Sequence, residues 1–215
     1  MKKTLILVLA LAGLAVAASA QGGTFKASLP VFTTSAGQSN DVNTVNIVME
    51  EAEIKYDYCD VPTVEMIQAG VGLAGKKSGE GFHVESTTDP TKFPTGTAFK
   101  TVVFAIGASL KGMGASGLTV DAEEARVKSL IAYCKKNKIL VVAIHVGGEA
   151  TRGAAGSDNE RMIDAVAPDA DVLIVTKDSN KDGRFTKIAD KTKAPLIQID
   201  YALGLVDIMK TAFGV

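Results

Sequence analysis

The amino-acid sequence predicts an α/β fold: a three-layer sandwich in which a five-stranded, mostly parallel sheet of flavodoxin-like or Rossmann-like order carries helices on both faces. Short runs of branched apolar residues, such as residues 139–144, are typical of strands buried on both faces. Segments with apolar residues at helical spacing follow these runs, so that strand and helix alternate five times. The chain contains no internal repeat and no evident linker. We therefore expect residues 21–215 to form one domain.

The first strand is expected at residues 29–34, where Gly37 then lets the chain turn tightly before a helix that Ser39 or Asn40 can cap. Residues 54–58 alternate apolar and charged side chains, as in an edge strand with one wet face. Pro62 opens a short helical stretch over residues 63–68. From residue 69 to 99 the composition shifts to Gly, Ser, Thr, Lys and Pro, which predicts a surface excursion in the form of a lid or hairpin.

The second half repeats the pattern of strand followed by helix. Strands are expected at residues 101–106, 139–144, 172–175 and 196–199. Thr119 offers an N-cap to a helix that reaches Asn137, and Ser157 with Glu160 has the spacing of a capping box for a helix that ends before Pro168. Two further helices are indicated by the apolar sets Phe185, Ile188 and Ala189, and Leu205, Ile208, Met209 and Ala212.

Residues 1–20 have the pattern of a secretory signal peptide. Lys2 and Lys3 precede an apolar run over residues 5–17, and the small residues 18–20 form a cleavage site before Gln21. The apolar run is shorter than the roughly 20 residues that a membrane-spanning helix needs. We expect export to the periplasm or the extracellular space, with no membrane insertion after cleavage of the signal.

The charge of the chain after residue 20 is nearly balanced. The whole chain has 23 basic and 24 acidic side chains, and loss of Lys2 and Lys3 leaves 21 against 24, a formal charge of −3. The basic residues are spread along the sequence, so neither nucleic acid nor an anionic membrane is an expected partner. This composition favours a small-molecule partner.

Cys59 and Cys134 are the two cysteines of the chain. Cys134 falls on the same helical face as Val127, Leu130 and Ile131, which predicts a buried packing residue. A disulfide between the two cysteines is the alternative that an oxidising compartment allows. Neither cysteine has the surroundings of a nucleophile or a metal ligand.

Four of the predicted strands break abruptly into polar loops that contain glycine. In an open parallel sheet, ligands bind beyond the carboxyl ends of the strands, so these four loops should share one site. The residues expected to bind the ligand are Ser35, Gly37, Gln38, Ser39, Asn40 and Asp41; Gly107, Ser109 and Lys111; His145, Gly147, Gly148, Glu149 and Arg152; and Lys177, Asn180 and Asp182.

His145, Glu149 and Arg152 form the group with the most distinctive chemistry. Arginine offers a forked set of donors to carboxylate or phosphate, and the neighbouring glycine amides add neutral donors. A small anionic solute is therefore the expected ligand. The alternative is a surface ion pair between Arg152 and Glu149, with His145 satisfied by a backbone carbonyl.

Residues 178–183 match the first half of a calcium-binding loop. Asp178, Asn180 and Asp182 take its first, third and fifth positions, and Gly183 takes the sixth. The twelfth position, which should be a bidentate acid, is Ala189. Calcium is therefore a secondary prediction. No other cofactor is expected, because the chain has neither a dinucleotide-binding nor a phosphate-binding glycine motif, and its histidines and cysteines are far apart.

The segments TTSAGQSNDV, IGASLKGMGASG, HVGGEATRGA and NKDGRFTKIA together resemble an uncharacterised family of small exported bacterial α/β proteins, a domain of unknown function. The likeness covers nearly all of the chain after residue 20. It implies a fold and a location in the cell envelope, and it carries no known activity.

A narrower resemblance lies in residues 37–40, Gly-Gln-Ser-Asn, which are similar to the GQSN block of sialate-type acetylesterases of the SGNH hydrolase class. The resemblance implies Ser39 as a nucleophile. That class activates its serine with an Asp-x-x-His near the C-terminus, whereas no histidine follows His145 here. His145 would have to be the base, with the amide of Gly37 or Gly107 in an oxyanion hole. The alternative is that Ser39 caps a helix and binds a ligand oxygen.

The sequence thus predicts, first, an exported protein that binds a small anionic solute and hands it to a transporter or sensor. The second hypothesis is a hydrolase of the serine-esterase type that uses Ser39 and His145. The third is a scaffold or interaction protein of the envelope.

Overall fold

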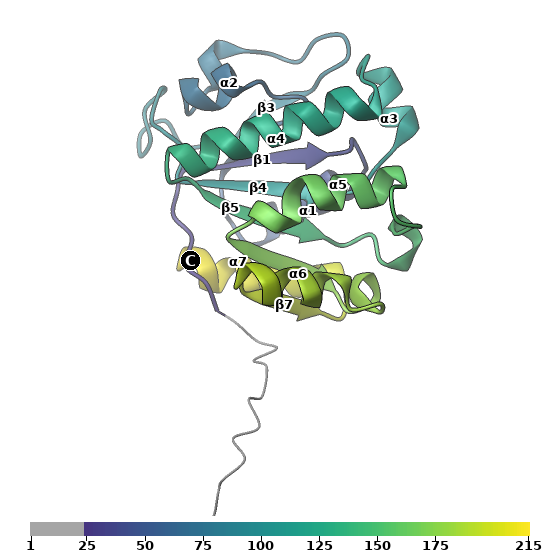
Figure 1. Ribbon diagram of the computed structural model, residues 1–215. Coiled ribbons are helices and arrows are strands. Elements are labelled where there is room, and N and C mark those ends of the chain that lie inside the picture. The colour runs from purple at the N-terminus through teal and green to yellow at the C-terminus, as the bar shows by residue number, and fades with distance from the viewer. Residues whose placement is uncertain (1–23) are drawn as a thin grey trace, which may run out of the picture.

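A seven-stranded sheet forms the central layer of the protein, in a computed structural model that describes residues 24–215 (Figure 1). The strand order is β3-β2-β1-β4-β5-β6-β7, and every neighbouring pair is parallel except β2 and β3. The predicted signal peptide, residues 1–20, lies outside the described residues. The strands are β1 (Val31–Ala36), β2 (Tyr56–Cys59), β3 (Val84–Ser86), β4 (Thr101–Ile106), β5 (Leu140–His145), β6 (Val172–Thr176) and β7 (Leu196–Ile199).

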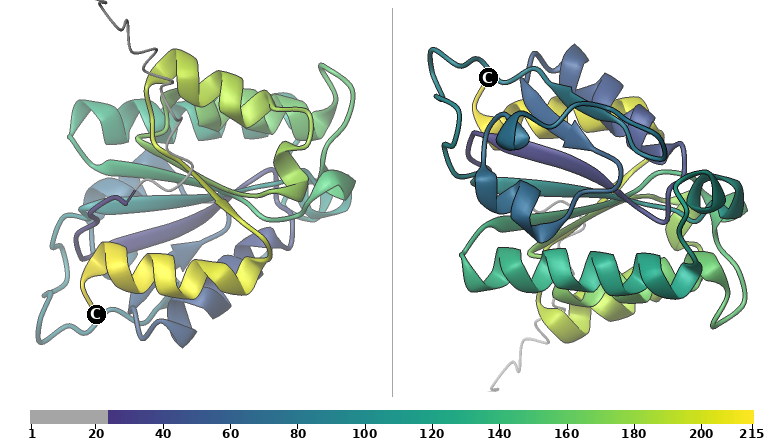
Figure 2. Two further views of the ribbon diagram at one scale, coloured as in Figure 1. Left: turned by 90° about the horizontal axis from the view of Figure 1, so that it is seen from below. Right: turned by 90° about the horizontal axis from the view of Figure 1, so that it is seen from above.

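Helices cover both faces of this sheet (Figure 2). One face packs against α1 (Asp41–Glu51) and α7 (Leu205–Phe213), and the other against α2 (Val64–Ala69), α4 (Val120–Lys136), α5 (Asp158–Val166) and α6 (Arg184–Thr192). The short helix α3 (Leu110–Ala115) lies at the edge toward which β1 and β4 point. The predicted α/β class, with helices on both faces of a mainly parallel sheet, is therefore confirmed.

The sheet has a separate apolar core on each face, because side chains along a strand alternate between the two faces. In β4, Val102, Phe104 and Ile106 pack toward α4 and α5, whereas Val103 and Ala105 pack toward α1. All five are at most 1% exposed. Burial of side chains such as these stabilises the fold by roughly 1.5–3 kcal/mol each for the larger ones, which makes the central strands a rigid support for the loops at their ends.

The sheet has seven strands, two more than the five predicted. Residues 54–58 were expected at a wet edge, but β2 is an interior strand that is buried at all four of its positions. The reason is β3, which arises inside the 69–99 excursion and pairs antiparallel with β2. Asp57, expected on the wet face, instead accepts a hydrogen bond from the Gly72 amide at 2.6 Å. The excursion is anchored to the core through Val71, Leu73 and Phe99.

The strand order contains the flavodoxin-like sequence. If the six parallel strands are numbered among themselves, their order is 2-1-3-4-5-6, which is the 2-1-3-4-5 order with one more strand at the end. From β1 the chain first adds β2 on one side and later returns to add β4 on the other. The direction of winding therefore reverses between β1 and β4, and this position is the topological switch point.

Local signals in the sequence gave mixed results. Thr119 caps α4 as predicted, since its hydroxyl accepts from the Ala122 amide at 3.1 Å. The capping box at α5 does not form, because Glu160 turns toward Arg152 and Ser157 makes no side-chain cap bond. The helix α3 lies in a segment where a loop is predicted, because its two glycines weaken the helical signal.

Cys59 and Cys134 are both free and buried, so the disulfide alternative is not seen. No helix among residues 24–215 is long and apolar enough to cross a membrane.

Candidate functional site

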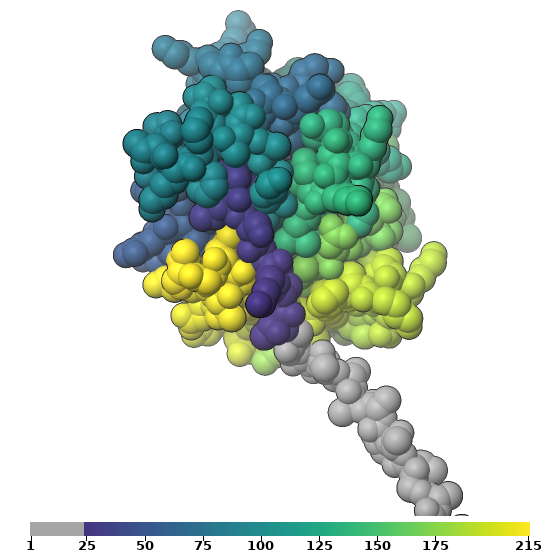
Figure 3. Space-filling view, turned by 90° about the vertical axis from the view of Figure 1, so that its left-hand side faces the viewer, coloured from purple at the N-terminus to yellow at the C-terminus, as the bar shows by residue number. Residues whose placement is uncertain are grey.

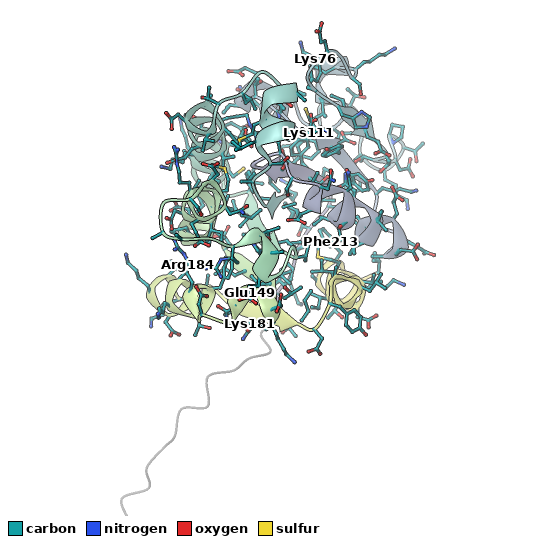
Figure 4. All side chains as sticks on the ribbon, turned by 90° about the vertical axis from the view of Figure 1, so that its right-hand side faces the viewer. Lys76, Lys111, Glu149, Lys181, Arg184 and Phe213 are labelled. Carbon is teal, nitrogen blue, oxygen red and sulfur yellow. The ribbon has the colours of Figure 1, made fainter. Side chains whose placement is uncertain are left out.

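The four predicted loops meet at one edge of the sheet because β1, β4, β5 and β6 all run in the same direction. Figure 4 looks onto this edge, with Lys111 above and Glu149, Lys181 and Arg184 below. The loops fall into two groups. Residues 37–41 and 107–111 lie at the switch point between β1 and β4, and residues 145–152 and 177–184 lie beyond β5 and β6.

Direct backbone contact holds the two loops of the switch point together. The Ser109 amide donates to the Gly37 carbonyl at 2.7 Å, and the Gly107 amide donates to the Ala36 carbonyl at 3.0 Å. A Cβ at Gly37 would lie 2.4 Å from the Gly107 carbonyl oxygen, and one at Gly112 would lie 2.2 Å from that of Gln38. These glycines are therefore required by the close contact between the two loops.

A buried ion pair on α4 supports the first loop from behind. Glu123, which is fully buried, accepts hydrogen bonds from the Gly37 amide at 2.8 Å and from the Gln38 side chain at 3.2 Å. Arg126 binds both carboxylate oxygens of Glu123 and also the Ser35 carbonyl at 2.8 Å. Sequence reasoning missed both residues. Their signal was two charged side chains three positions apart, just before the apolar face that begins at Val127.

Ser39 and Asp41 place polar side chains next to Gly107 at the switch point. A Cβ at Gly107 would lie 2.5 Å from both the Ser39 hydroxyl and Asp41 Oδ2, so the two groups face the same spot. Asp41 Oδ2 is buried and has no hydrogen-bond partner among the described residues. Burial raises the pKa of the Asp41 carboxyl, an effect that the Ser39 hydroxyl partly offsets. The Ser39 hydroxyl accepts a long bond from the Asp41 amide, at 3.3 Å.

The other predicted residues of the switch point have simpler surroundings. Asn40 begins α1 without a side-chain cap bond, and Ser109 caps α3 by accepting from the Gly112 amide at 3.0 Å. The Ser35 hydroxyl is buried without a partner in the described part of the chain. Lys111 is exposed and makes no ion pair within residues 24–215. It is thus a cation available to a ligand.

At the end of β5, His145 is a buried side chain with protein partners on both ring nitrogens. Its Nδ1 lies 2.8 Å from the Ser179 hydroxyl, and its Nε2 lies 3.4 Å from the Thr151 carbonyl oxygen. The ring also packs against Phe185, with 5.3 Å between the centroids. His145 makes no hydrogen bond to Ser39 among the described residues, so the structure does not assemble a serine–histidine pair from them.

Arg152 is held by acidic side chains of α5 and the loop before α6. It makes two hydrogen bonds to Glu160, at 2.6 and 3.2 Å, and two to Asp182, at 3.1 and 2.8 Å. A fifth bond reaches the Ser179 carbonyl. The alternative prediction, a surface pair between Arg152 and Glu149, is wrong, because Glu149 bonds to Lys181 at 2.8 Å instead. All the donor nitrogens of Arg152 therefore have protein partners.

Glu160 joins Arg152 to a second arginine that sequence reasoning missed. Arg184 reaches Glu160 at 2.7 Å and also contacts Asp164. Burial raises the pKa of the Glu160 carboxyl, but the bonds from Arg152 and the Gly153 amide outweigh it, so the pKa is lowered overall. Glu160 itself is fully buried. We call the set Arg152, Glu160, Asp182 and Arg184 the arginine network, and its saturated contacts indicate a role in holding the loops.

The glycines and the lysine near this network are also engaged in contacts within the protein. A Cβ at Gly147 would lie 2.3 Å from the Thr151 hydroxyl, and Gly148 adopts a positive φ of 69°. Lys177 pairs with Asp200 at 2.7 Å.

The residues of the predicted calcium loop each take a different protein partner. Asp178 accepts from the Glu149 amide at 2.7 Å and pairs with Lys181. Asn180 Oδ1 accepts from the Phe185 amide in the first turn of α6 at 2.9 Å, and Asp182 pairs with Arg152. Within residues 24–215, no group of three or more His, Cys, Asp or Glu side chains is arranged to hold a metal ion.

The burial of His145 makes a prediction about acid stability. Burial is the main cause that lowers its pKa to about 4. Between the unfolded pKa of about 6.5 and this value, only the unfolded chain takes up the proton, so the free energy of unfolding should fall by up to about 1.4 kcal/mol per pH unit as the pH decreases. Urea denaturation from pH 7 to pH 4 measures this slope. It should diminish in His145→Gln and persist in His83→Gln, whose histidine is exposed; equal slopes in both variants would contradict the assignment.

Comparison with known proteins adds a family and one distant structure. No curated protein matches the chain. A solved structure of the psychrotrophic esterase EstA from Pseudoalteromonas sp., inhibited by monoethylphosphonate, matches at 8% identity over 81% of this chain and 78% of that one. The TM-score of this match is 0.33. The family described as domain of unknown function DUF6305 matches residues 28–213, as the resemblance to an uncharacterised family implied, and the chain belongs to it.

Proposed function

We propose that this protein is an exported binding protein that holds a small solute at the switch point between β1 and β4. The observation that carries the proposal is the buried, unpartnered Oδ2 of Asp41 beside the Ser39 hydroxyl. An unsatisfied buried polar group costs roughly 1–3 kcal/mol, and more when it is charged. Such a cost is tolerated at sites where a bound molecule completes the hydrogen bonds.

The rigidity of the surrounding loops supports this proposal. Gly37 and Gln38 both have positive φ values, of 103° and 60°. Glu123 and Arg126 fix this backbone from behind, and Ser109 fixes it from the side. Strained backbone that its surroundings hold in place is frequent at ligand sites. Ser39 and Asp41 are therefore positioned before any ligand arrives, which reduces the entropy that binding must overcome.

The chemistry of the site favours a small hydroxy acid as the solute. A carboxylate at Asp41 accepts hydrogen bonds, so it would hold a hydroxyl group of the ligand, with Ser39 as a second contact. Lys111, one residue before the Gly112 that packs on Gln38, offers a positive charge to an anionic group. This keeps the prediction of an anionic ligand but moves the cation from Arg152, whose donors are occupied, to Lys111.

A thermal-shift screen tests the proposal. Lactate, malate and gluconate should each be compared with the matching alcohol and the matching simple carboxylate. A ligand at 100 times its Kd stabilises the folded state by about 2.7 kcal/mol, which raises Tm by several degrees. Ser39→Ala and Asp41→Asn should abolish the shift while changing the unfolding free energy of the free protein by less than about 1 kcal/mol.

The control is Asp207→Asn, which changes the acidic residue in the first turn of α7 on the same face of the sheet as α1. This variant should keep the full shift. If no hydroxy acid produces a shift, or if Asp207→Asn loses it as Asp41→Asn does, the proposed site is wrong. Turnover of a simple acetyl ester that disappears in Ser39→Ala would instead favour the hydrolase hypothesis.

Export is the part of the proposal that depends on residues 1–20. Expression of the full chain in a bacterial host, followed by fractionation and N-terminal sequencing, should give a periplasmic protein that starts at Gln21. A cytoplasmic protein that retains Met1 or Lys2 would contradict it.

A further inference from the structure

A pocket of about 520 Å³ lies at the edge of the sheet opposite the switch point, at the amino ends of β4 and β5. Figure 3 looks onto this edge, where the segment before β1 (purple) lies between the C-terminal helix (yellow) and the green surface that includes the end of α4. Ile139 and Leu140 line the pocket together with six polar residues. The polar residues are Lys26 and Ser28 before β1, Lys100 before β4, Lys135 and Lys138 at the end of α4, and Asp171 before β6.

The charges of this pocket are strongly unbalanced. Asp171 is neutralised by Lys135 at 2.5 Å, and its other oxygen accepts from the Val141 amide at 2.9 Å. Lys26, Lys100 and Lys138 make no ion pair within residues 24–215. Three lysines without an ion pair thus line one hollow, on a chain whose formal net charge is −1. Their mutual repulsion is relieved when an anion binds.

Backbone hydrogen bonds, which do not depend on side-chain charge, fix the main chain at or next to the three unpaired lysines. Lys138 has a positive φ of 57°, and its amide donates to the Lys135 carbonyl at the end of α4. The Lys100 amide donates to Pro30 and its carbonyl accepts from Leu140, at 2.9 and 3.0 Å. Next to Lys26, the Ala27 amide donates to the Ala212 carbonyl at 2.9 Å. Three distant segments are therefore held around one hollow before a ligand is present.

We propose that this lysine pocket binds a small ligand that carries two or more negative charges on phosphate-type groups. Lysine binds phosphate as a mobile point charge, without the planar geometry that arginine offers to carboxylates. A multiply charged ligand can engage Lys26, Lys100 and Lys138 together, whereas a single carboxylate would be held weakly by exposed lysines in salt solution. The volume of the pocket falls in the usual range for small-molecule sites, about 300–1,000 Å³.

Helix stabilisation alone does not account for the cluster. Lysines in the last turn of a helix interact favourably with the negative end of its dipole, which suffices to explain Lys135 and Lys136. Lys26 and Lys100 belong to other segments and gain nothing from the α4 dipole. Their convergence with Lys138 on one hollow is what indicates a ligand.

Calorimetric titration of pyrophosphate into the full chain, at constant ionic strength, tests the proposal. We expect saturable binding that weakens at least tenfold in the double variant Lys100→Gln/Lys138→Gln. The matched control is Lys136→Gln, since Lys136 is an exposed lysine of the same helix end that does not line the pocket. It should bind within twofold of the unchanged protein. Absence of binding to the unchanged protein, or an equal loss in Lys136→Gln, would overturn the proposal.

Two further binding measurements identify the source of the phosphate group and show whether this pocket binds independently of the switch point. If vesicles of phosphatidylglycerol also bind, and the double variant loses both ligands, the source is a lipid headgroup; binding of pyrophosphate without vesicles indicates a soluble ligand. Vesicle binding without pyrophosphate binding would overturn the proposal, since it would reflect a charged surface. The variants Ser39→Ala and Asp41→Asn should bind pyrophosphate normally, because they lie at the other end of the sheet.

Discussion

Replacement of Glu160 by alanine is expected to lower the free energy of unfolding by about 3–5 kcal/mol, because it removes the buried carboxylate that two arginines share and leaves the Arg152 Nε donor without its partner. Glu160 is fully buried and contacts both Arg152 and Arg184, at 2.6 and 2.7 Å. The Arg152 side chain is only 10% exposed, so water cannot easily replace the lost carboxylate. Urea denaturation at pH 7, with and without the substitution, measures the loss.

The control for this prediction is Asp164→Ala on the same helix. Asp164 also pairs with Arg184, but its side chain is 57% exposed, so its loss should cost less than about 1 kcal/mol. The double variant Arg152→Met/Glu160→Met should be more stable than Glu160→Ala, since it also removes the mostly buried guanidinium whose Nε has lost its partner. If Glu160→Ala and Asp164→Ala cost the same, the arginine network does not hold the loops.

Replacement of Gly37 by alanine is expected to cost about 2–4 kcal/mol and to remove ligand binding at the switch point. Gly37 has a φ of 103°, which L-residues rarely adopt. Its new Cβ would lie 2.4 Å from the Gly107 carbonyl oxygen and 2.8 Å from the side chain of Met162, so backbone must shift. The same shift would displace Ser39 from Gly107. Denaturation and the thermal-shift screen measure the two effects.

Gly96→Ala separates the clash from the backbone strain. Gly96 also has a positive φ, of 88°, but a Cβ there would meet no atom within 4 Å. Its substitution should cost only about 1 kcal/mol and leave ligand binding unchanged. If Gly37→Ala is as mild as Gly96→Ala, the two loops of the switch point are not held as rigidly as their contacts indicate.

The fold class could be predicted from the sequence because it depends on local patterns. Runs such as residues 101–106 are buried at every position, and the helices on both faces have apolar residues at helical spacing. The number of strands could not be predicted in the same way. The strand β3 is only three residues long and partly exposed, and it exists because it pairs with β2, a contact between distant segments that leaves little local pattern.

The edge that carries the candidate site could also be predicted, because parallel strands bring the loops that follow them together. The roles of individual side chains could not. Arg152 looked like a ligand for anions, but its partner Glu160 lies eight residues away, where its spacing from Ser157 suggested a helix cap. The charge pattern along the chain also suggested no basic cluster, since Lys26, Lys100 and Lys138 come together only when the sheet forms.

The helix α4 runs the full depth of the molecule and takes part in both proposed sites. Its first turn carries Glu123, which holds the Gly37 amide, and its last turn carries Lys135, which lines the opposite pocket. Its 17 residues span about 25 Å at 1.5 Å per residue. The helix α4 thus connects the two opposite edges of the sheet. A shift of α4 along its axis would therefore change the geometry of both proposed sites at once.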